Sequence, residues 1–389
     1  MRTINKPDEK IIKFINGIYG VLLRCVMHTK TYESLMDMVF GIINSPRLDC
    51  ASIGDTLAQR FGLSAKHTTK QVSRLFGNEK INVWELLPRL ARRILASRKE
   101  VVVAMDWTEF DDDDHSTLML SIVTKHGRAT PLLWHTVWKY ELTDGGRNDH
   151  EDNCLRRLAE ILPEGTKVTI LADRGFGDHK LFAFLDEIGF SYVIRFRSNI
   201  YITAESGERR TAGEWIGKDG RLRKVRNVLF GASAQAPVKA VVCVHEKNMQ
   251  DSWCLATNLA HLSGHTVKKL YARRWTIEPG FRDIKDARFG MGLGEVRIFE
   301  PTRRDRLLFA NAMATLILTI LGQAAEAVGL NMKLKVNTTK RRTHSLFNLG
   351  KRVCGMLANM RRLDRNELLR KFREILQETN EIIGVYGVV

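Results

Sequence analysis

Cysteine is scarce in this chain, and the few cysteines form none of the patterns that indicate a structural role. There are six among 389 residues. No two are separated by two residues, and no histidines at zinc-finger spacing accompany them, so neither a zinc ribbon nor a disulfide framework is expected. We therefore expect reduced thiols in a cytoplasmic protein. The six are Cys25, Cys50, Cys154, Cys243, Cys254 and Cys354.

Long hydrophobic runs are also missing. The apolar stretch Ile11–Val26 is interrupted by Lys13 and Arg24, which argues against a signal peptide. The most apolar run, Leu307–Leu321, has 15 residues and contains Asn311. A membrane-spanning helix needs about 20 apolar residues, so this run is better interpreted as a buried helix. We also find no basic amphipathic helix that would anchor the chain to a membrane surface.

Negative charge is under-represented relative to positive charge. The chain has 61 Lys and Arg against 44 Asp and Glu, which gives a formal net charge of +17 at pH 7. Such a surface attracts a polyanion. Nucleic acid is the most common one, because Lys and Arg contacts to phosphates release condensed counterions. A soluble basic protein without such a partner is the alternative. The hydrophobic content of 44% is that of a globular protein with a large core.

Residues 1–98 have apolar positions at three- and four-residue spacing, which predicts helices. Two short helices, Ser52–Phe61 and Lys66–Phe76, flank a tight turn at Gly62–Ser64, which is the layout of a DNA-binding helix-turn-helix. An ordinary helical hairpin is the alternative. The residues expected to pack inward are Leu57, Ala58, Val72 and Leu75. Those expected to face a DNA groove are Lys66, Lys70, Gln71 and Arg74.

From about residue 99 the sequence changes to strands that alternate with helices, which indicates an α/β core. Short β-branched apolar runs are typical of buried strands, and longer amphipathic segments separate them. The predicted strands are Val101–Met105, Leu118–Val123, Pro131–Trp138, Val168–Ala172 and Tyr192–Phe196. The predicted helices are Cys154–Leu162 and Lys180–Ile188.

Residues 197–262 differ again, with scattered glycines, many Lys and Arg, and two strand candidates, Val238–Val244 and Trp253–Thr257. We interpret them as a mainly β insertion in the α/β core. From Thr266 onward the chain is predicted to be helical, with a basic loop at Lys333–Arg342. The predicted domains are a helical domain over 1–98, an α/β domain over 99–305, and a C-terminal helical region over 306–389 that is a candidate for dimerisation.

Two of the predicted buried strands run directly into an aspartate. Val101–Met105 is followed by Asp106, and Val168–Ala172 by Asp173. A carboxylate at the end of a buried strand lies at the edge of a sheet, where clefts form, although either aspartate alone could instead cap a helix or begin a turn. Such carboxylates suit phosphodiester chemistry with two Mg²⁺ or Mn²⁺ ions, because these hard cations prefer oxygen ligands. A third carboxylate is usually required.

The best candidate for the third carboxylate is Glu278. On a helix, Tyr271, Arg274, Glu278 and Lys285 fall within a stripe of roughly 60°. An aromatic ring, two cations and a carboxylate make a poor core. They make a good surface for a DNA strand, with Glu278 on metal and the two cations on phosphates. An exposed helix with ordinary ion pairs is the alternative. Pro279 predicts a kink or a new helix start beside Glu278.

The pattern Tyr-x2-Arg-x3-Glu-x6-Lys, filled by these four residues, resembles the signature of a large family of bacterial insertion-sequence DDE transposases. Its members include cut-and-paste enzymes that form DNA hairpins. The Met-Asp-Trp-Thr segment at Asp106 and the Ala-Asp-Arg-Gly-Phe-Gly segment at Asp173 also look like this family. The resemblance covers residues 100–300. The four-residue signature together with both aspartates is specific, whereas any one piece alone is not.

The resemblance implies an RNase H-like catalytic core with a mainly β insertion before the catalytic glutamate. It implies that Asp106, Asp173 and Glu278 bind Mg²⁺, for which Mn²⁺ would substitute. The expected partners are terminal inverted repeats and target DNA. Because two ends must be brought together, a homodimer on DNA is expected, in the bacterial cytoplasm and associated with the nucleoid. By the same resemblance, Tyr271, Arg274 and Lys285 would contact the DNA backbone, and Trp253 would stack on a base flipped out during hairpin formation.

Other polar residues carry weaker signals. Asp111–Asp114, followed by His115, is interpreted as a solvated hairpin loop, because four consecutive carboxylates of an extended chain cannot face one ion. Glu109 is a candidate for supporting Asp106. The remaining candidates are Arg174 and Arg282 as phosphate contacts, His135, His150 and His179 as structural histidines, and Trp253 as a packed strand residue if it does not stack on DNA.

Two alternative functions stay open at this point. A metal-dependent DNA nuclease that does not rejoin its product would need the same three carboxylates. A non-catalytic DNA-binding protein, such as a transposase-derived repressor, would not need all three, and all three are present.

Overall fold

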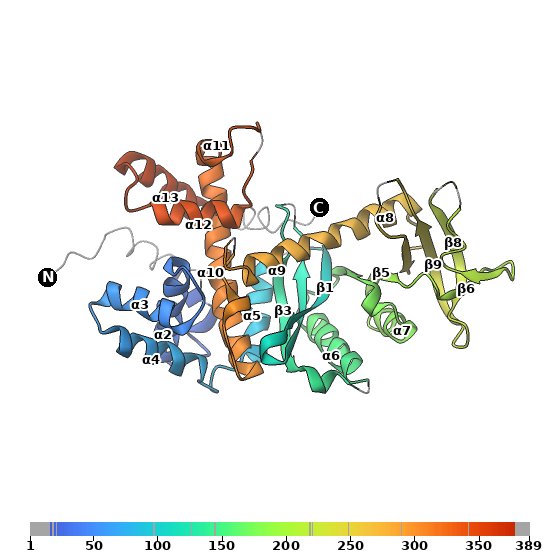
Figure 1. Cartoon of the computed structure of the whole chain (residues 1–389), viewed down its shortest axis with the longest axis horizontal. Coiled ribbons are helices and arrows are strands. Elements are labelled where there is room, and N and C mark those ends of the chain that lie inside the picture. The colour runs from blue at the N-terminus through green and yellow to red at the C-terminus, as the bar shows by residue number, and fades with distance from the viewer. Residues whose placement is uncertain are drawn as a thin grey trace.

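The computed structural model describes residues 16–377, apart from positions 18, 21, 96, 97, 125, 144, 218, 220, 248, 289 and 341. Part of the apolar stretch Ile11–Val26, and Arg341 of the predicted basic loop, therefore lie outside the described residues. The molecule is elongated. Helices from both ends of the chain gather at one end of it, and the β-rich segment lies at the other (Figure 1).

One mixed sheet runs through the middle of the molecule. Its strands, among the described residues, are β1 (Glu100–Phe110), β2 (His115–Ile122), β3 (Thr130–Trp138), β4 (Lys167–Ala172), β5 (Ser191–Phe196), β6 (Tyr201–Thr203), β7 (Arg209–Thr211), β8 (Arg223–Phe230), β9 (Ala236–Val244) and β10 (Trp253–Thr257). Their order is β3-β2-β1-β4-β5-β10-β9-β8-β6-β7. β1 pairs antiparallel with β2, whereas β1, β4 and β5 are parallel neighbours. The α/β fold class is confirmed.

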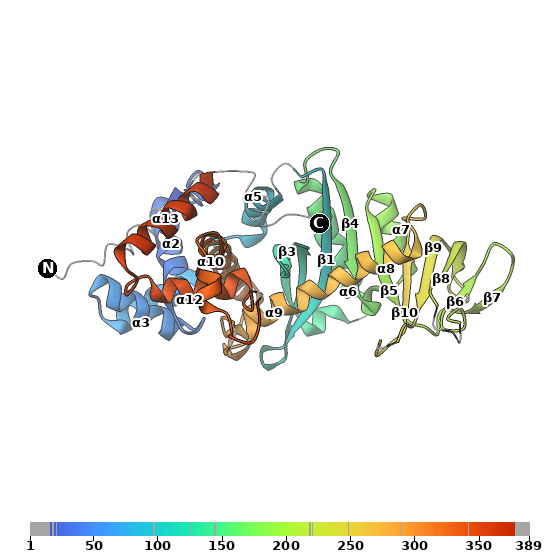
Figure 2. The ribbon, with the colours of Figure 1, turned by 90° about the horizontal axis from the view of Figure 1, so that it is seen from above.

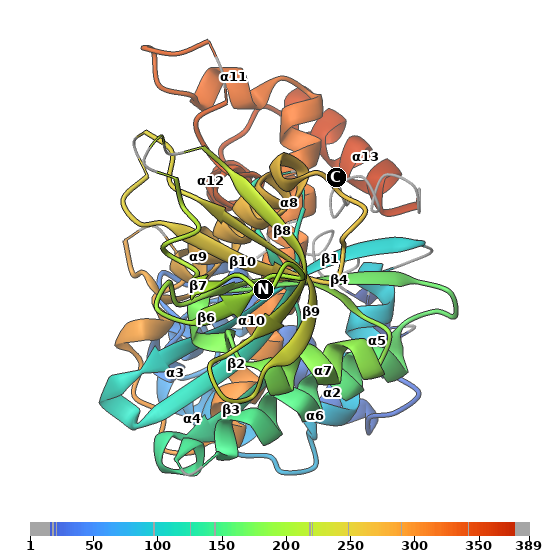
Figure 3. The ribbon, with the colours of Figure 1, turned by 90° about the vertical axis from the view of Figure 1, so that its right-hand side faces the viewer.

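The described helices are α2 (Thr29–Asn44), α3 (Cys50–Phe61), α4 (Ala65–Phe76), α5 (Val83–Leu95), α6 (Gly146–Ile161), α7 (His179–Glu187), α8 (Gly264–Ala272), α9 (Ile277–Lys285), α10 (Pro301–Ala327), α11 (Leu330–Leu334), α12 (Leu346–Met356) and α13 (Arg362–Gln377). Some of them cover both faces of the sheet: α6 and α7 lie on one face, and α8 and α9 lie on the other (Figures 1 and 3). From above, α8 and α9 form one rod that crosses the strands (Figure 2).

The two aspartates predicted at strand ends lie beside each other, because β1 and β4 are parallel neighbours. Met105 is the last residue of β1 that pairs with β4, and its partner Ala172 is the last residue of β4. Asp173 therefore follows its strand as predicted. The prediction that β1 ends before Asp106 is wrong. β1 continues to Phe110, because β2 keeps pairing with it after β4 has ended.

The helix pair predicted near residue 60 is confirmed. α3 ends at Gly62, whose φ of 67° lies in the left-handed region that favours glycine. The Ser64 side chain caps α4 by accepting a hydrogen bond from the His67 N–H group. α4 presents a basic face to solvent. Leu57, Ala58, Val72 and Leu75 are buried as predicted, and Lys66, Lys70, Gln71 and Arg74 are exposed.

The insertion over residues 197–262 holds more strands than the sequence indicates. β9 and β10 confirm the two predicted strands, and β6, β7 and β8 add to them. These three went unrecognised because they are short or largely exposed; β7 has no buried residue and therefore no apolar alternation. Since β10 pairs with β5, the insertion extends the core sheet directly.

α10 is the longest described helix, with 27 residues, and it contacts elements from every part of the chain, including α2, α5, β3, α12 and α13. Among the described residues it is the one helix long and apolar enough to cross a membrane by length and composition. However, 83% of its most apolar stretch is buried inside the protein. The predicted buried helix over Leu307–Leu321 is thus confirmed. α10 also runs through the predicted domain boundary at residue 305, and that division stays a prediction.

Two glycines allow α10 and α12 to pack with their backbones in contact. A Cβ atom on Gly322 of α10 would collide with the carbonyl oxygen of Leu346, and one on Gly350 of α12 would collide with that of Leu318. Glycine is required at both positions because no other residue leaves room for the opposite backbone. This contact fixes the C-terminal helices on the central helix.

We expect Gly350→Ala to lower the free energy of unfolding by about 1–3 kcal/mol, because the added methyl group must push the helices apart. Urea denaturation at equilibrium measures the change. Gly355→Ala in the same helix is the matched control, since its added Cβ meets no atom within 4 Å. The control should be neutral or stabilising by up to about 1 kcal/mol. Equal destabilisation by both variants would show that helix contact is not the cause.

Candidate active site

The three carboxylates predicted to act together come from three different elements. Asp106 lies in β1, Asp173 directly follows β4, and Glu278 lies in the first turn of α9. The Asp173 side chain also caps the short helical turn that follows it, because its Oδ1 accepts a hydrogen bond from Gly175 N–H at 2.8 Å. The α8–α9 rod, which carries Glu278, crosses the strands of the sheet (Figure 2).

The rod that carries Glu278 is helical along its length. α8 continues into a 3₁₀ segment, Arg273–Thr276, which leads directly into α9. Pro279 lies in the first turn of α9, the part of a helix that tolerates proline. The kink or new helix start predicted beside Glu278 is therefore a short stretch of tighter 3₁₀ helix just before it.

Arg274 connects two of the three carboxylates. Its Nη1 donates to Asp106 Oδ2 at 3.1 Å, and its Nη2 donates to Glu278 Oε1 at 3.1 Å. Arg274 is only 7% exposed, so its contact with the largely buried Asp106 lies in a medium of reduced dielectric, whereas Glu278 is half-exposed and its contact is screened by solvent. In this structure its charge compensates protein carboxylates. A contact of Arg274 with a DNA phosphate stays a prediction.

The carboxyl group of Asp106 has a pKa raised to about 6. Burial is the largest cause, because it penalises the charged form. The Arg274 guanidinium lowers the pKa, and the negative charges of Asp173 and Glu278 raise it. The influence of both carboxylates on Asp106 indicates that the three groups share one electrostatic site.

The remaining signature residues are also held by protein contacts. Lys285 Nζ donates to Thr108 Oγ1 at 3.1 Å and to the carbonyl oxygen of Glu109, which ties the end of α9 to β1. Tyr271 is buried, and its ring packs edge-to-face against Trp253 with centroids 4.9 Å apart. Their DNA contacts stay predictions. The packing of Trp253 is what the alternative interpretation as a strand residue expects.

The other predicted DNA contacts lie at the surface. Arg174 follows Asp173, is largely exposed, and has its Nη1 4.0 Å from Asp251 Oδ2. Arg282 is exposed on α9. The structure does not bring the basic residues of α4 to the carboxylates, because α4 belongs to the helical end of the molecule (Figure 1). These residues are Lys66, Lys70 and Arg74.

The Asp111–Asp114 run forms the predicted turn between β1 and β2. One part of that prediction is wrong: the Asp113 side chain is only 7% exposed and pairs with Arg304 of α10, so it is not solvated. Glu109 accepts a hydrogen bond from Ser116 Oγ at 3.0 Å, and its support of Asp106 stays a prediction. The predicted structural histidines make protein contacts: the rings of His135 and His150 lie 5.5 Å apart, and His179 pairs with Asp178.

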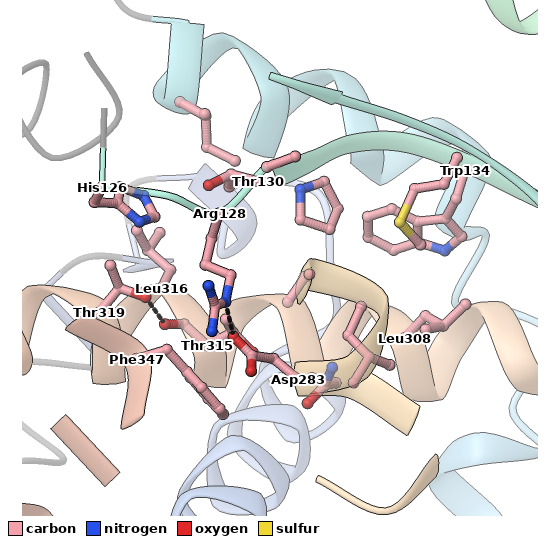
Figure 4. A pocket seen from close by; sticks show the side chains of 18 residues that line it. His126, Arg128, Thr130, Trp134, Asp283, Leu308, Thr315, Leu316, Thr319 and Phe347 are labelled. Carbon is pink, nitrogen blue, oxygen red and sulfur yellow. Dashed lines mark hydrogen bonds and ion pairs between the residues drawn. The ribbon is translucent and has the colours of Figure 1, made fainter. Parts of the chain in front are cut away.

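An ion pair anchors the side of α9 that faces away from the aspartates. Its two residues are 155 positions apart in the sequence, so no local sequence pattern predicts it. Arg128 Nε donates to Asp283 Oδ2 at 2.6 Å, and both side chains are largely buried (Figure 4). Gly280, Asp283 and Ile284 lie opposite Glu278 on the helix. Together with residues of α10 and α12 they line a small, partly open cavity of about 50 Å³. The ion pair supports α9 from behind and so orients Glu278.

The three carboxylates suit a hard divalent cation by their chemistry, because Mg²⁺ and Mn²⁺ prefer carboxylate oxygens. In this structure, however, their spacing is not that of a metal site: among the described residues, no three His, Cys, Asp or Glu side chains stand close enough to hold one metal ion. The Arg274 guanidinium lies between Asp106 and Glu278 and pairs with both. The donor atoms thus suit a metal ion by their chemistry, and binding one would require the guanidinium to move aside.

Comparison with known proteins agrees with this geometry. Residues 98–317, more than half of the chain, match the family described as the transposase DDE domain. The chain belongs to the DDE transposase family. No curated protein gives a significant match. The matched span contains all three carboxylates, so the mixed sheet and its flanking helices are the RNase H-like core of a DDE transposase.

Family membership establishes the activity in general terms. A DDE transposase is a metal-dependent enzyme of DNA transposition and recombination, so DNA is the substrate of this transposase.

We expect Arg274→Met to leave the charges of Asp106 and Glu278 uncompensated. The variant transposase should then melt at a lower temperature in EDTA. It should gain roughly twice the stabilisation from Mn²⁺, because the added cation supplies the missing positive charge. A thermal-shift titration with Mn²⁺ measures both effects.

The matched control is Arg174→Met, which removes an exposed arginine next to Asp173 and should behave as the wild type. If Mn²⁺ raises the melting temperature of Arg274→Met less than that of the wild type, Arg274 positions the carboxylates for the ion and does not merely replace its charge.

Proposed function

We propose that this protein is an insertion-sequence transposase that binds terminal inverted repeats, cleaves the element ends and joins them to target DNA. The observation that carries the proposal is that Arg274 bridges Asp106 and Glu278 while Asp173 directly follows the strand paired with β1, all within the DDE domain. Cleavage and joining are both phosphoryl transfers at one kind of acidic site, so a single site serves both steps.

Asp106, Asp173 and Glu278 would hold Mg²⁺, and Mn²⁺ would substitute for it, because both are hard cations. Two such ions supply an activated water or 3′-hydroxyl and stabilise the leaving oxygen. Arg274 contacts two of these carboxylates, Asp106 and Glu278. A planar guanidinium can bind a phosphate through two parallel hydrogen bonds, just as it binds a carboxylate. We therefore assign Arg274 to the DNA backbone in the complex.

The other signature residues would position the scissile strand. Lys285 keeps α9 against β1 through Thr108, so Glu278 stays over the aspartates. A strand lying along α9 would bring its phosphates to Lys285, and the exposed Arg174 and Arg282 would contact it on either side. Tyr271 supports Trp253, which would stack on a base extruded during hairpin formation.

The exposed face of α4 is the proposed reader of the terminal repeat. Lys66, Lys70 and Arg74 point to solvent from the second helix of the helix pair, which is the helix that enters the major groove in such folds. Two element ends must be held at once, so we propose a homodimer on DNA with the C-terminal helices as its candidate interface. The protein would act in the bacterial cytoplasm, at the nucleoid.

Two other functions fit part of the observations. A transposase-derived repressor would bind DNA without cutting it, but it would not need Asp106, Asp173 and Glu278 together. A metal-dependent nuclease would cut without joining. The strand-transfer product separates the nuclease from the transposase.

We expect the purified protein to cut a labelled DNA that carries the element's terminal repeats at the repeat boundary in Mg²⁺. Asp173→Ala should reduce cutting by at least roughly 100-fold, since losing even a group that only supports a metal ligand costs 10–100-fold. Asp173→Asn is the matched variant, because it can still cap Gly175 N–H but lacks the charge. It should lose activity equally.

A hairpin product that disappears in Trp253→Ala, while first-strand nicking persists, would support the stacking role of Trp253. Repeat binding without cutting in Mg²⁺ or Mn²⁺ would leave a DNA-binding protein. Cutting that never yields joined product would leave a nuclease.

We expect replacement of Lys66, Lys70 and Arg74 by glutamine to weaken repeat binding and to flatten its salt dependence. If each cation neutralises one phosphate, the slope of log K against log salt falls by about 0.9 per residue. Fluorescence anisotropy over a salt series measures the slope. Lys167→Gln is the control, because Lys167 is exposed on β4 but far from the α4 face; an equal effect there would reject the assignment.

A further inference from the structure

The start of α10 holds three consecutive charged residues that are all buried. Arg304 is fully buried, and Asp305 and Arg306 are 8% and 7% exposed. Successive residues on a helix point about 100° apart, so the three side chains reach three different elements. Buried charges are costly unless they are paired or hydrogen-bonded. The contacts of these residues therefore indicate what this part of the helix holds together.

Arg306 reaches the DNA-binding helix pair. Its Nη1 donates to the carbonyl oxygen of Phe76, the last residue of α4, at 2.9 Å, and its Nε donates to the carbonyl oxygen of Ile81 at 3.1 Å. A cation at a helix C-terminus is favourable because it meets the free carbonyl groups and the negative end of the helix dipole. One turn earlier, Arg303 donates to Ser73 Oγ of the same helix at 2.9 Å.

Arg304 and Asp305 reach the catalytic sheet. Arg304 lies 3.8 Å from the ring centroid of Phe110, the last residue of β1, and it pairs with Asp113. It also donates through Nε to His115 Nδ1 at 3.1 Å, at the start of β2. Asp305 accepts a hydrogen bond from Thr136 Oγ1 of β3 at 2.6 Å.

The two sets of contacts lie one residue apart on the same rigid helix. β1 carries Asp106, and α4 carries the exposed basic face. The position of α4 relative to Asp106 is therefore set through the first two turns of α10, without passing through a loop. An apolar residue would fill the site of Arg306 at a lower desolvation cost. Such a residue would not fix the distance and angle of the end of α4. Arg306 does fix them, because it donates to two carbonyl oxygens, at and just after that end.

We propose that Arg304, Asp305 and Arg306 fix the number of base pairs between the sequence bound by α4 and the phosphodiester that is cut at Asp106, with Arg306 as a positioning residue. This inference rests on the proposed function. A transposase must cut at one defined bond, so an error of one base-pair step in the position of α4 would move the cut.

The first test maps the cut at single-nucleotide resolution on DNA that carries the terminal repeat. Arg306→Met should bind the repeat within about threefold of the wild type but spread the cuts over neighbouring phosphodiesters. Arg306→Lys keeps the charge and one donor and should give an intermediate spread. If Arg306→Met fails to fold, the cut pattern of Arg306→Lys tests the inference instead.

Arg98→Met is the matched control. Arg98 is also a buried arginine that caps the end of a helix, since it donates to the carbonyl oxygens of Ile94 and Leu95 at the end of α5. Its loss should lower the melting temperature as much as Arg306→Met does, yet leave one defined cut. Equal scatter in both variants would mean that lost stability, and not lost positioning, moves the cut.

The second test needs no cleavage. Spin labels at Asp55→Cys on α3 and Glu164→Cys in the loop before β4, in a chain whose accessible Cys25 and Cys50 are replaced by serine, report the distance between the helix pair and the sheet. Arg306→Met should broaden the distance distribution roughly twofold, and Arg98→Met should not.

If Arg306→Met cuts only at the wild-type position and its distance distribution is unchanged, the inference is wrong. The transposase assignment is then still intact. A wild-type protein that does not cut at the repeat boundary would overturn the proposed function. The distance measurement would then still decide whether Arg306 holds the helix pair in place.

Discussion

Asp106 and Asp173 meet because β1 and β4 are parallel and in register up to Met105 and Ala172. A shift of one residue in this pairing would turn one of the aspartates to the opposite face of the sheet, away from α9. The charge of the site follows from this register. Two carboxylates held side by side, with Glu278 laid over them, repel one another unless a cation is present. Arg274 supplies that cation within the protein.

The rod that delivers Glu278 is fastened at several points. Lys285 ties its end to β1, the pair of Arg128 and Asp283 supports its outer side, and Tyr271, at the end of α8, packs against Trp253. The insertion takes part in this, because its strand β10 continues the core sheet and carries Trp253. The site thus sits on rigid elements, which is what a reaction at one defined bond requires.

Local patterns in the sequence predict most of the fold and the identities of the site residues. Short β-branched apolar runs give β4, β5 and β10, turn chemistry gives the α3–α4 pair, and strand-end aspartates with the Tyr-Arg-Glu-Lys spacing give the carboxylates. What the sequence does not give depends on distant partners. β1 runs past Asp106 because of β2, the Asp113 side chain is shielded by its pairing with Arg304 of α10, and Arg274 turns to Asp106 from 168 positions away.

The packing of α12 on α10 has a consequence for damaged copies of the gene. A chain that stopped before Leu346 would leave the apolar side of a 27-residue helix open to water. Exposed surfaces of that size lead to aggregation and proteolysis. A copy truncated at that point is therefore expected to aggregate or be degraded instead of accumulating as a folded fragment. The segment from Leu346 onward is thus needed for the rest of the protein to persist.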